Sequence, residues 1–238
     1  MKRPFVLIAF LFIAAAIVRS QTSDAKLKFQ EKFVLPDSAV AAGIDGEMRV
    51  SFDIDKSGSV KKVHIWSGPA WPCGQNPKQE IKAVREAVRN HVAMMKFEPA
   101  IKDGRPAEAS GALDFKIGDA FTETTEEEAR TTGKKRKIDN GPLRNYAIDI
   151  PVPAYPLHEK YGPSGTVRVR VVIDEGGTVL LAGAESGNSI FHDAARTSAC
   201  KAKFKPILEN GTPIRFTGFI VYEFTPPGLR NKDFYPPQ

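Results

Sequence analysis

The stretch that decides the fold runs from residue 165 to 224 and reads GTVRVRVVIDEGGTVLLAGAESGNSIFHDAARTSACKAKFKPILENGTPIRFTGFIVYEF. Every second residue from Val167 to Ile173 is apolar, which predicts a strand with one buried face. Asp174-Glu-Gly-Gly177 then supplies turn residues, because glycine adopts the positive φ that a tight hairpin requires. An Ala-rich stretch and a last β-rich run follow. The expected order is therefore strand, hairpin, strand, helix, strand.

The same pattern occurs once earlier, so the chain is a tandem repeat. A shift of 119 residues places 46–68 on 165–187 with nine identities in 23 positions, including Asp55 on Asp174 and Gly58 on Gly177. A shift of 107 aligns the later part of each copy, so the first copy carries 119 − 107 = 12 extra residues before or within its helix. A period above 100 residues indicates two domains rather than a solenoid of small units.

Composition is consistent with two domains and limits the classes of partner that we expect. The chain has 238 residues and 42% hydrophobic content, enough for two ordinary cores. Its formal net charge is +6, and no recognised nucleic-acid-binding motif accompanies that charge, so we expect no nucleic-acid partner. Two free thiols are expected for the two cysteines, Cys73 and Cys200; a disulfide between them, which an oxidising compartment permits, is the alternative.

Residues 1–20 have the pattern of an export signal peptide. Lys2-Arg3 is followed by an apolar segment from Pro4 to Val18, and cleavage fits after Ser20. The alternative is a short uncleaved anchor, although 15 apolar residues span only roughly 22 Å of a ~30 Å hydrocarbon core. In either case the rest of the chain lies outside the cytoplasm, which is the periplasm in a Gram-negative cell. Membrane contact is expected only if the segment stays uncleaved.

The first domain is predicted at residues 33–117. It has strand patterns near 48–54 and 60–65, a loop rich in proline and glycine at 66–77, and a closing strand near 109–117. Between the loop and the closing strand lies an amphipathic helix. Its apolar stripe, at spacings of 3, 4, 4 and 3, is Ile81, Val84, Val88, Val92 and Met95.

Residues 118–150 are interpreted as a charged linker. An acidic, Thr-rich run is followed by Lys134-Lys-Arg-Lys137, and the low apolar content predicts a hydrated connector that buries no core. Binding of the basic tetrad to anionic headgroups or nucleic acid is the alternative. The second domain is predicted at 151–225 and a Pro-rich extended tail at 226–238. The buried stripe expected for the second helix is Phe191, Ala194, Ala195, Ser198, Ala199 and Ala202.

Short motifs follow one another in a fixed order along 151–225: Tyr-Pro, Gly-x-Val, a hairpin with Asp and Gly, a helix, Phe-x-Pro and Asn-Gly-x-Pro. The residues that carry them are Tyr155, Pro156, Gly165, Asp174, Gly177, Phe204, Pro206, Asn210 and Gly211. This ordered set resembles the TonB C-terminal domain family. Residues 33–117 resemble it more weakly, since Leu35-Pro36 and Asp103-Gly104 replace two of the motifs. The resemblance implies an α+β fold with two tandem small domains, each a short antiparallel sheet packed on one helix.

The resemblance also implies a protein-binding role. TonB C-terminal domains bind an extended segment of an outer-membrane receptor, which adds as a strand to the sheet. An open sheet edge carries unpaired N–H and C=O groups that pair readily with such a segment. The run 216–224 is the candidate edge, and each of its apolar residues has a core position as the alternative. The candidate partner-binding residues are Phe216, Phe219, Ile220, Val221, Tyr222 and Phe224.

The N-terminal half departs from a full energy transducer. The apolar segment contains no His, and no long Pro-rich spacer follows it, so coupling to a proton-driven motor is not implied. We expect an exported, periplasmic TonB-like protein that binds segments of outer-membrane or other envelope proteins, with TonB-dependent transport as the finer hypothesis. The alternative is a secreted structural protein whose copies self-associate into a homo-oligomer through the same edges.

No pattern of catalytic or metal-binding residues stands out. The four histidines lack metal-ligand spacing, and no nucleophile elbow, phosphate loop or dinucleotide fingerprint occurs. The segment from Asp53 begins like a calcium loop, but His64 stands where a bidentate Glu is needed, and a hairpin turn explains it better. We expect no enzymatic activity, no cofactor and no metal.

Overall fold

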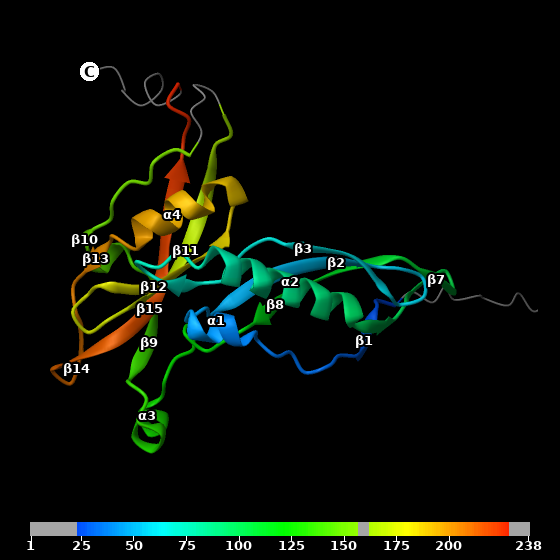
Figure 1. Ribbon diagram of the computed structural model, residues 1–238, viewed down its shortest axis with the longest axis horizontal. Helices are drawn as coiled ribbons and strands as arrows, with labels where there is room; N and C mark the ends of the chain where they lie inside the picture. Colours follow the sequence, from blue (N-terminus) through cyan, green and yellow to red (C-terminus); the bar gives the residue numbers. More distant parts are fainter. Residues whose placement is uncertain (1–22, 157–161, 229–238) are drawn as a thin grey trace, which may run out of the picture.

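The computed structural model describes residues 23–156 and 162–228 (Figure 1). The predicted export signal and most of the Pro-rich tail lie outside these residues. The fold is α+β, as expected: mainly antiparallel sheets, with helices packed on them. Among the described residues, no helix combines the length and the apolar character required to span a membrane.

The first domain is a three-stranded antiparallel sheet in the order β3-β2-β8, covered on one face by a long helix. Its elements are β2 (Glu47–Ile54), β3 (Val60–Ile65), α2 (Lys78–Met94) and β8 (Ala109–Lys116). Alternate residues of β2, such as Met48 and Val50, are fully buried under the helix. The predicted helix stripe is confirmed, because Val84, Val88 and Val92 are completely buried in the same core.

Short elements border this sheet. They are β1 (Lys26–Phe29), α1 (Asp37–Ala41), β5 (Lys96–Glu98), β6 (Ala100–Lys102) and β7 (Arg105–Ala107). β1 pairs with β5, and β6 forms a hairpin with β7. Asp103 adopts a φ of 53° at the tip of that hairpin, in the place expected for the turn.

The second domain repeats the plan with a shorter helix. Its elements are β11 (Gly165–Ile173), β12 (Val179–Ser186), η2 (Ser189–Phe191), α4 (His192–Ala199), β13 (Lys203–Phe204), β14 (Ile207–Glu209) and β15 (Thr212–Phe224). β11 is central and pairs with β15 along its whole length, from Gly165 opposite Phe224 to Ile173 opposite Phe216. Phe191 is fully buried, as the helix stripe predicts, and stacks on Phe224 with ring centroids 4.3 Å apart.

The two domains share the same turn geometry, which confirms the repeat in atomic detail. Asp55 and Asp174 each cap their hairpin by accepting hydrogen bonds from two backbone N–H groups at 2.7–3.0 Å. Gly58 and Gly177 both have a φ of +83°. A Cβ at either position would overlap the carbonyl oxygen of the phenylalanine in the following Phe-x-Pro motif. Glycine is therefore required twice for the same reason, a close backbone approach.

The extra residues of the first domain are bound to the second domain by strand pairing and a disulfide. β4 (Trp71–Pro72), in the loop before α2, pairs with β12 and extends the second sheet. Cys73, the next residue, forms a disulfide with Cys200, with an S–S distance of 2.08 Å and Cα atoms 5.5 Å apart. The expectation of two free thiols is therefore wrong, and the alternative, the disulfide, is what the structure contains.

Arg196 on α4, in the second domain, binds the same short strand of the first domain. Its buried guanidinium donates hydrogen bonds to the carbonyl oxygens of Ala182 at 3.1 Å, Trp71 at 2.8 Å and Pro72 at 3.0 Å. It also lies 3.7 Å from the centre of the Trp71 ring, a cation–π contact. Burial lowers the pKa of Arg196 to about 10, so the side chain keeps its charge at neutral pH.

The prediction that residues 118–150 bury no core is wrong. Their elements are α3 (Glu126–Thr132), β9 (Lys137–Pro142), η1 (Arg144–Tyr146) and β10 (Ala147–Asp149). β9 pairs with β15 in parallel, and Leu143 after it is completely buried in the second core. Composition missed this because main-chain pairing holds a largely polar strand in place, and a few apolar residues, Leu143 above all, then reach the core.

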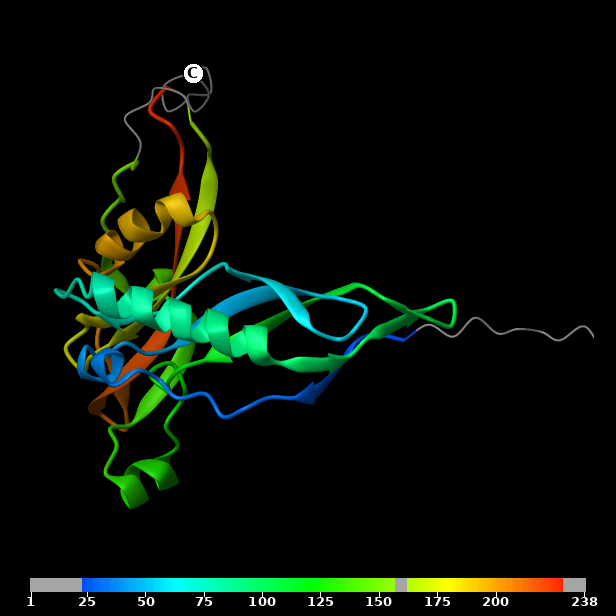
Figure 2. The ribbon, with the colours of Figure 1, turned by 45° about the vertical axis from the view of Figure 1, so that its right-hand side comes forward.

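The two domains lie crosswise, as Figure 2 shows. In both views β11 and β15 cross the direction of α2, and α3 projects from the molecule beyond the start of β9. α4 lies over β11, on the face of the second sheet that its buried side chains share.

Candidate strand-binding edge

The two edges of β15 are occupied to different extents. One edge pairs with β11 from Phe216 to Phe224. The opposite edge pairs with β9 from Arg215 to Phe219, and β14 pairs with the first three residues of β15. The last bond on this side runs from the Leu143 N–H to the Phe219 carbonyl, at 3.1 Å. Beyond it, residues 220–224 pair with no strand on that side within the described ranges, and we call this stretch the open edge.

The predicted edge residues divide between the core and the surface. Four point into the second core and are almost fully buried: Phe216, Ile220, Tyr222 and Phe224. Phe219 is half-buried and has the Arg168 guanidinium 4.8 Å from its ring centre. Val221 is 53% exposed. What the open edge offers a partner is therefore its main chain and the exposed side chains of Val221 and Glu223. A role in binding stays a prediction for all six residues.

A groove of about 570 Å³ lies along the open edge. Residues 219–223 form one wall, and residues 142–144 and 150–153 form the other. Val152 on the second wall is 76% exposed, so apolar surface faces solvent on both sides of the groove. This volume falls within the usual range of ligand pockets. No pattern in the sequence indicates that residues 150–153 lie beside residues about 70 positions later in the chain.

The Tyr222 hydroxyl is a buried polar group in the lining of the groove. It has no hydrogen-bond partner in the described part of the chain, and burial raises the pKa of the phenol. Buried polar groups are nearly always satisfied in native structures, by protein, water or a ligand.

The residues of the family motifs have structural positions. Tyr155 packs on Phe191 and donates its hydroxyl hydrogen to the Pro163 carbonyl at 2.8 Å. Asn210 and Gly211, with φ of 51° and 81°, form the tip between β14 and β15. The rest lie at strand ends, turns and the core: Pro156 and Pro206 are exposed, Gly165 begins β11, Asp174 and Gly177 shape the hairpin, and Phe204 is buried. None of them contributes to the walls of the groove.

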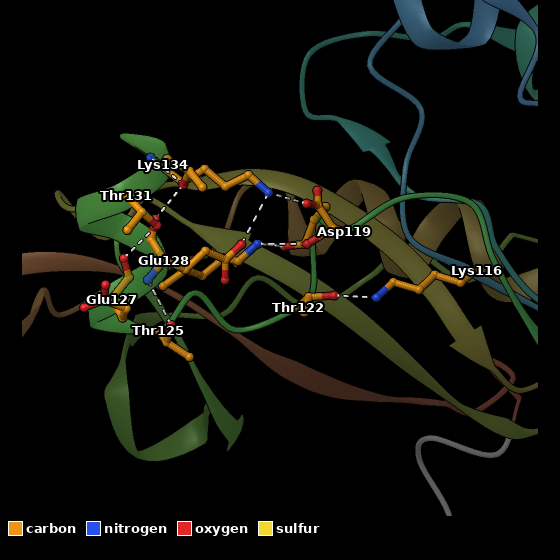
Figure 3. Close-up of polar contacts among 11 residues, drawn as sticks. Lys116, Asp119, Thr122, Thr125, Glu127, Glu128, Thr131 and Lys134 are labelled. Atoms are coloured by element: carbon orange, nitrogen blue, oxygen red, sulfur yellow. Dashed lines mark hydrogen bonds and ion pairs between the residues drawn. The ribbon is translucent and has the colours of Figure 1, made fainter.

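The basic tetrad is engaged within the chain. Figure 3 shows Lys134 between Asp119 and Glu128, with N···O distances of 2.8 and 3.5 Å. The other three side chains also have partners: Lys135 pairs with Glu175, Arg136 with Glu209, and Lys137 donates to the carbonyl oxygens of Asp119 and Ala120. All four side chains of the tetrad thus have partners within the chain.

The first domain presents a corresponding edge on β8. β8 occupies the place of β15 in the repeat and pairs with β2 along all eight of its residues. No other strand in the described part of the chain pairs with β8. Its outward face is polar, with Asp114 in a bidentate pair with Arg49 at 2.7–2.8 Å. The chain thus has two comparable edges, one partly covered and one uncovered.

Comparison with known families tests the repeat independently. The family described as Gram-negative bacterial TonB protein C-terminal matches residues 31–117 and again 151–226. The chain belongs to this family. The two matched segments agree with the two copies predicted from the internal repeat, so the protein carries two TonB C-terminal domains in tandem. No curated protein sequence matches the chain significantly.

Membership gives the coarse function. TonB C-terminal domains are a family of protein-interaction domains, and membership indicates a TonB-like role in the bacterial envelope for this chain. Within the described residues, no group of three His, Cys, Asp or Glu side chains is arranged to hold a metal ion. The chemistry that both TonB domains present is main-chain hydrogen bonding at a sheet edge.

Proposed function

We propose that this TonB-family protein is exported to the periplasm and binds extended segments of envelope proteins by β-strand addition at the open edge of β15. The finer role that we propose is in TonB-dependent transport, with the segment supplied by an outer-membrane protein. Neither catalysis nor a cofactor enters this function.

The observation that supports the proposal is the open edge lying beside an apolar groove. Alternate N–H and C=O groups of an edge strand point outward, so residues 220–224 supply a short ladder for an added strand. Strand addition takes affinity from that ladder and specificity from pockets for alternate side chains. Val221 and Val152 supply the apolar contacts for such a pocket.

Self-association is the second candidate, and the uncovered edge of β8 favours it. A copy that offers two edges could pair with further copies, since an open strand edge is a template for another chain. In that case the partner captured at an edge is the protein itself.

The test places a photoreactive benzoylphenylalanine at Val221 in living cells and identifies the captured proteins by mass spectrometry. Val40 on α1 is the matched control, because it is a valine of similar exposure, 60% against 53%, in the other domain. Capture of outer-membrane or other envelope proteins from position 221, but not from position 40, is the expected result. Equal capture at both positions would overturn the role of the open edge. Capture of only further copies would favour self-association.

A further inference from the structure

We infer that β9 is a built-in occupant of the acceptor edge, and that a partner segment resembles β9 and takes its place. This inference rests on the proposed function and deepens it, because it gives the chemistry and direction of the segment. The edge of β15 that carries β9 continues directly into the open edge. A segment longer than about five residues therefore meets β9 if it follows the whole edge in its ~3.3 Å steps.

β9 behaves as an added strand rather than a member of the fold's repeat. It comes from the segment between the domains, runs parallel to β15, and has no counterpart beside β8 among the described residues. Its own residues are exposed or half-buried. On its outer side it carries an isolated bridge to Thr124, and the Asp139 N–H donates to the Glu123 carboxylate at 2.8 Å. Main-chain pairing on one edge is the mode by which an extended peptide joins a sheet.

The contacts of β9 specify what the edge accepts. Ile138 lies opposite Phe216 and packs against the second core. Asp139 pairs with the Arg170 guanidinium of β11. Gly141 lies so close to Gly218 that a Cβ on Gly218 would overlap the Gly141 carbonyl oxygen. The partner we infer is thus an extended segment, parallel to β15, with an apolar residue followed by an acidic residue that reaches Arg170.

Occupancy by β9 lowers the affinity of that edge for any other segment. When a site is open for only a fraction of the time, its apparent affinity for a ligand is its intrinsic affinity multiplied by that fraction. The ion pair between Asp139 and Arg170 is half-buried, at 31% and 21% side-chain exposure, so reversing the charge of Asp139 weakens the hold of β9 on the edge.

The test uses a fluorescent synthetic peptide with the sequence of residues 136–143 and the full-length chain in vitro. Binding is followed by anisotropy, and a photoreactive group on the peptide maps its position. The Asp139→Arg chain is expected to bind the peptide about tenfold more tightly than the wild type, with crosslinks on β15. Glu98→Arg in β5 is the matched control, because it changes the net charge equally at an exposed site away from β9. It is expected to leave the affinity unchanged.

A second peptide and a second variant keep the test decisive. A peptide with Arg in place of its Asp is expected to bind the Asp139→Arg chain more weakly than the native-sequence peptide does, since its Arg is repelled by Arg170. If Asp139→Arg fails to fold by circular dichroism, Asp139→Asn replaces it, with a gain of about threefold.

Three results would overturn the inference: equal affinity for wild-type and variant chains, binding by neither, or equal affinity of the two peptides for the variant chain. Capture of envelope proteins at Val221 together with unchanged peptide affinity would overturn this inference alone. A peptide gain without any partner captured at Val221 would overturn the proposed function alone.

Discussion

Replacing Leu143 with alanine tests whether the segment between the domains is part of the second core. Leu143 has no exposed surface, and its side chain packs against the backbone at Gly218. The change removes three carbon atoms, worth about 2.4 kcal/mol at ~0.8 kcal/mol each, and leaves a cavity that adds to the cost. We expect the free energy of unfolding of the second domain to fall by about 3–4 kcal/mol.

The measurement is urea unfolding of the chain with its disulfide intact, followed by circular dichroism. Leu208→Ala is the matched control, because Leu208 in β14 is 60% exposed, and its cost is expected below about 0.5 kcal/mol. A loss under about 1 kcal/mol for Leu143→Ala would refute the reasoning and return this segment to a hydrated connector.

Three further predictions follow from single sites. Cys73→Ser removes the disulfide to Cys200, which joins residues 127 positions apart. It should lower the free energy of unfolding, measured by urea titration, by about 2–5 kcal/mol. An unchanged midpoint of urea unfolding under oxidising conditions would count against the disulfide. Gly177→Ala should destabilise the fold more than Gly211→Ala, because both glycines have a φ near +80° but only at Gly177 would a Cβ overlap a carbonyl oxygen. Gly211→Ala should cost about 1–2 kcal/mol. Equal shifts of the melting temperature for the two variants would contradict the close approach of the Phe204 carbonyl to Gly177. Burial lowers the pKa of His192 below its usual 6.5, so the unfolded state takes up the proton first and the free energy of unfolding falls as the pH drops below about 6.5. His192→Gln should flatten that part of the curve of stability against pH. An identical curve for the variant would refute the assignment of this pH dependence to His192.

The sequence predicts the strands and helices of both domains because each is specified by residues that lie close together in the chain. Period-two alternation in β2 and β11, turn glycines at 58 and 177, and the valine stripe of α2 each express a short-range requirement. Since the same requirements recur at a constant shift, the repeat and the family resemblance could be read before any coordinates were known.

What the sequence could not show are the contacts between distant segments. β4 has only two residues, and its place beside β12 depends on Arg196 and the disulfide from the other domain. β9 is polar, so no hydrophobic pattern marks it as a strand. The candidate edge predicted at 216–224 lies within β15, and its division into a covered stretch and an open stretch follows from β9 alone.

The side chains of the predicted edge illustrate the same limit. Alternation in β15 predicts that two faces differ, yet not which face meets α4. Ile220 and Tyr222 proved to be core residues, while Val221 between them faces solvent. A single strand pattern therefore could not separate contact residues from core residues.

Hydrogen exchange on a complex tests the central claim most directly. The segment identified by the Val221 crosslink is made as a synthetic peptide and added in excess to the protein, and amide exchange is compared with the free protein. The account predicts slower exchange at amides within residues 220–224, because an added strand accepts hydrogen bonds from outward N–H groups. Unchanged exchange there, with protection on another surface of the bound protein, would contradict strand addition at the open edge.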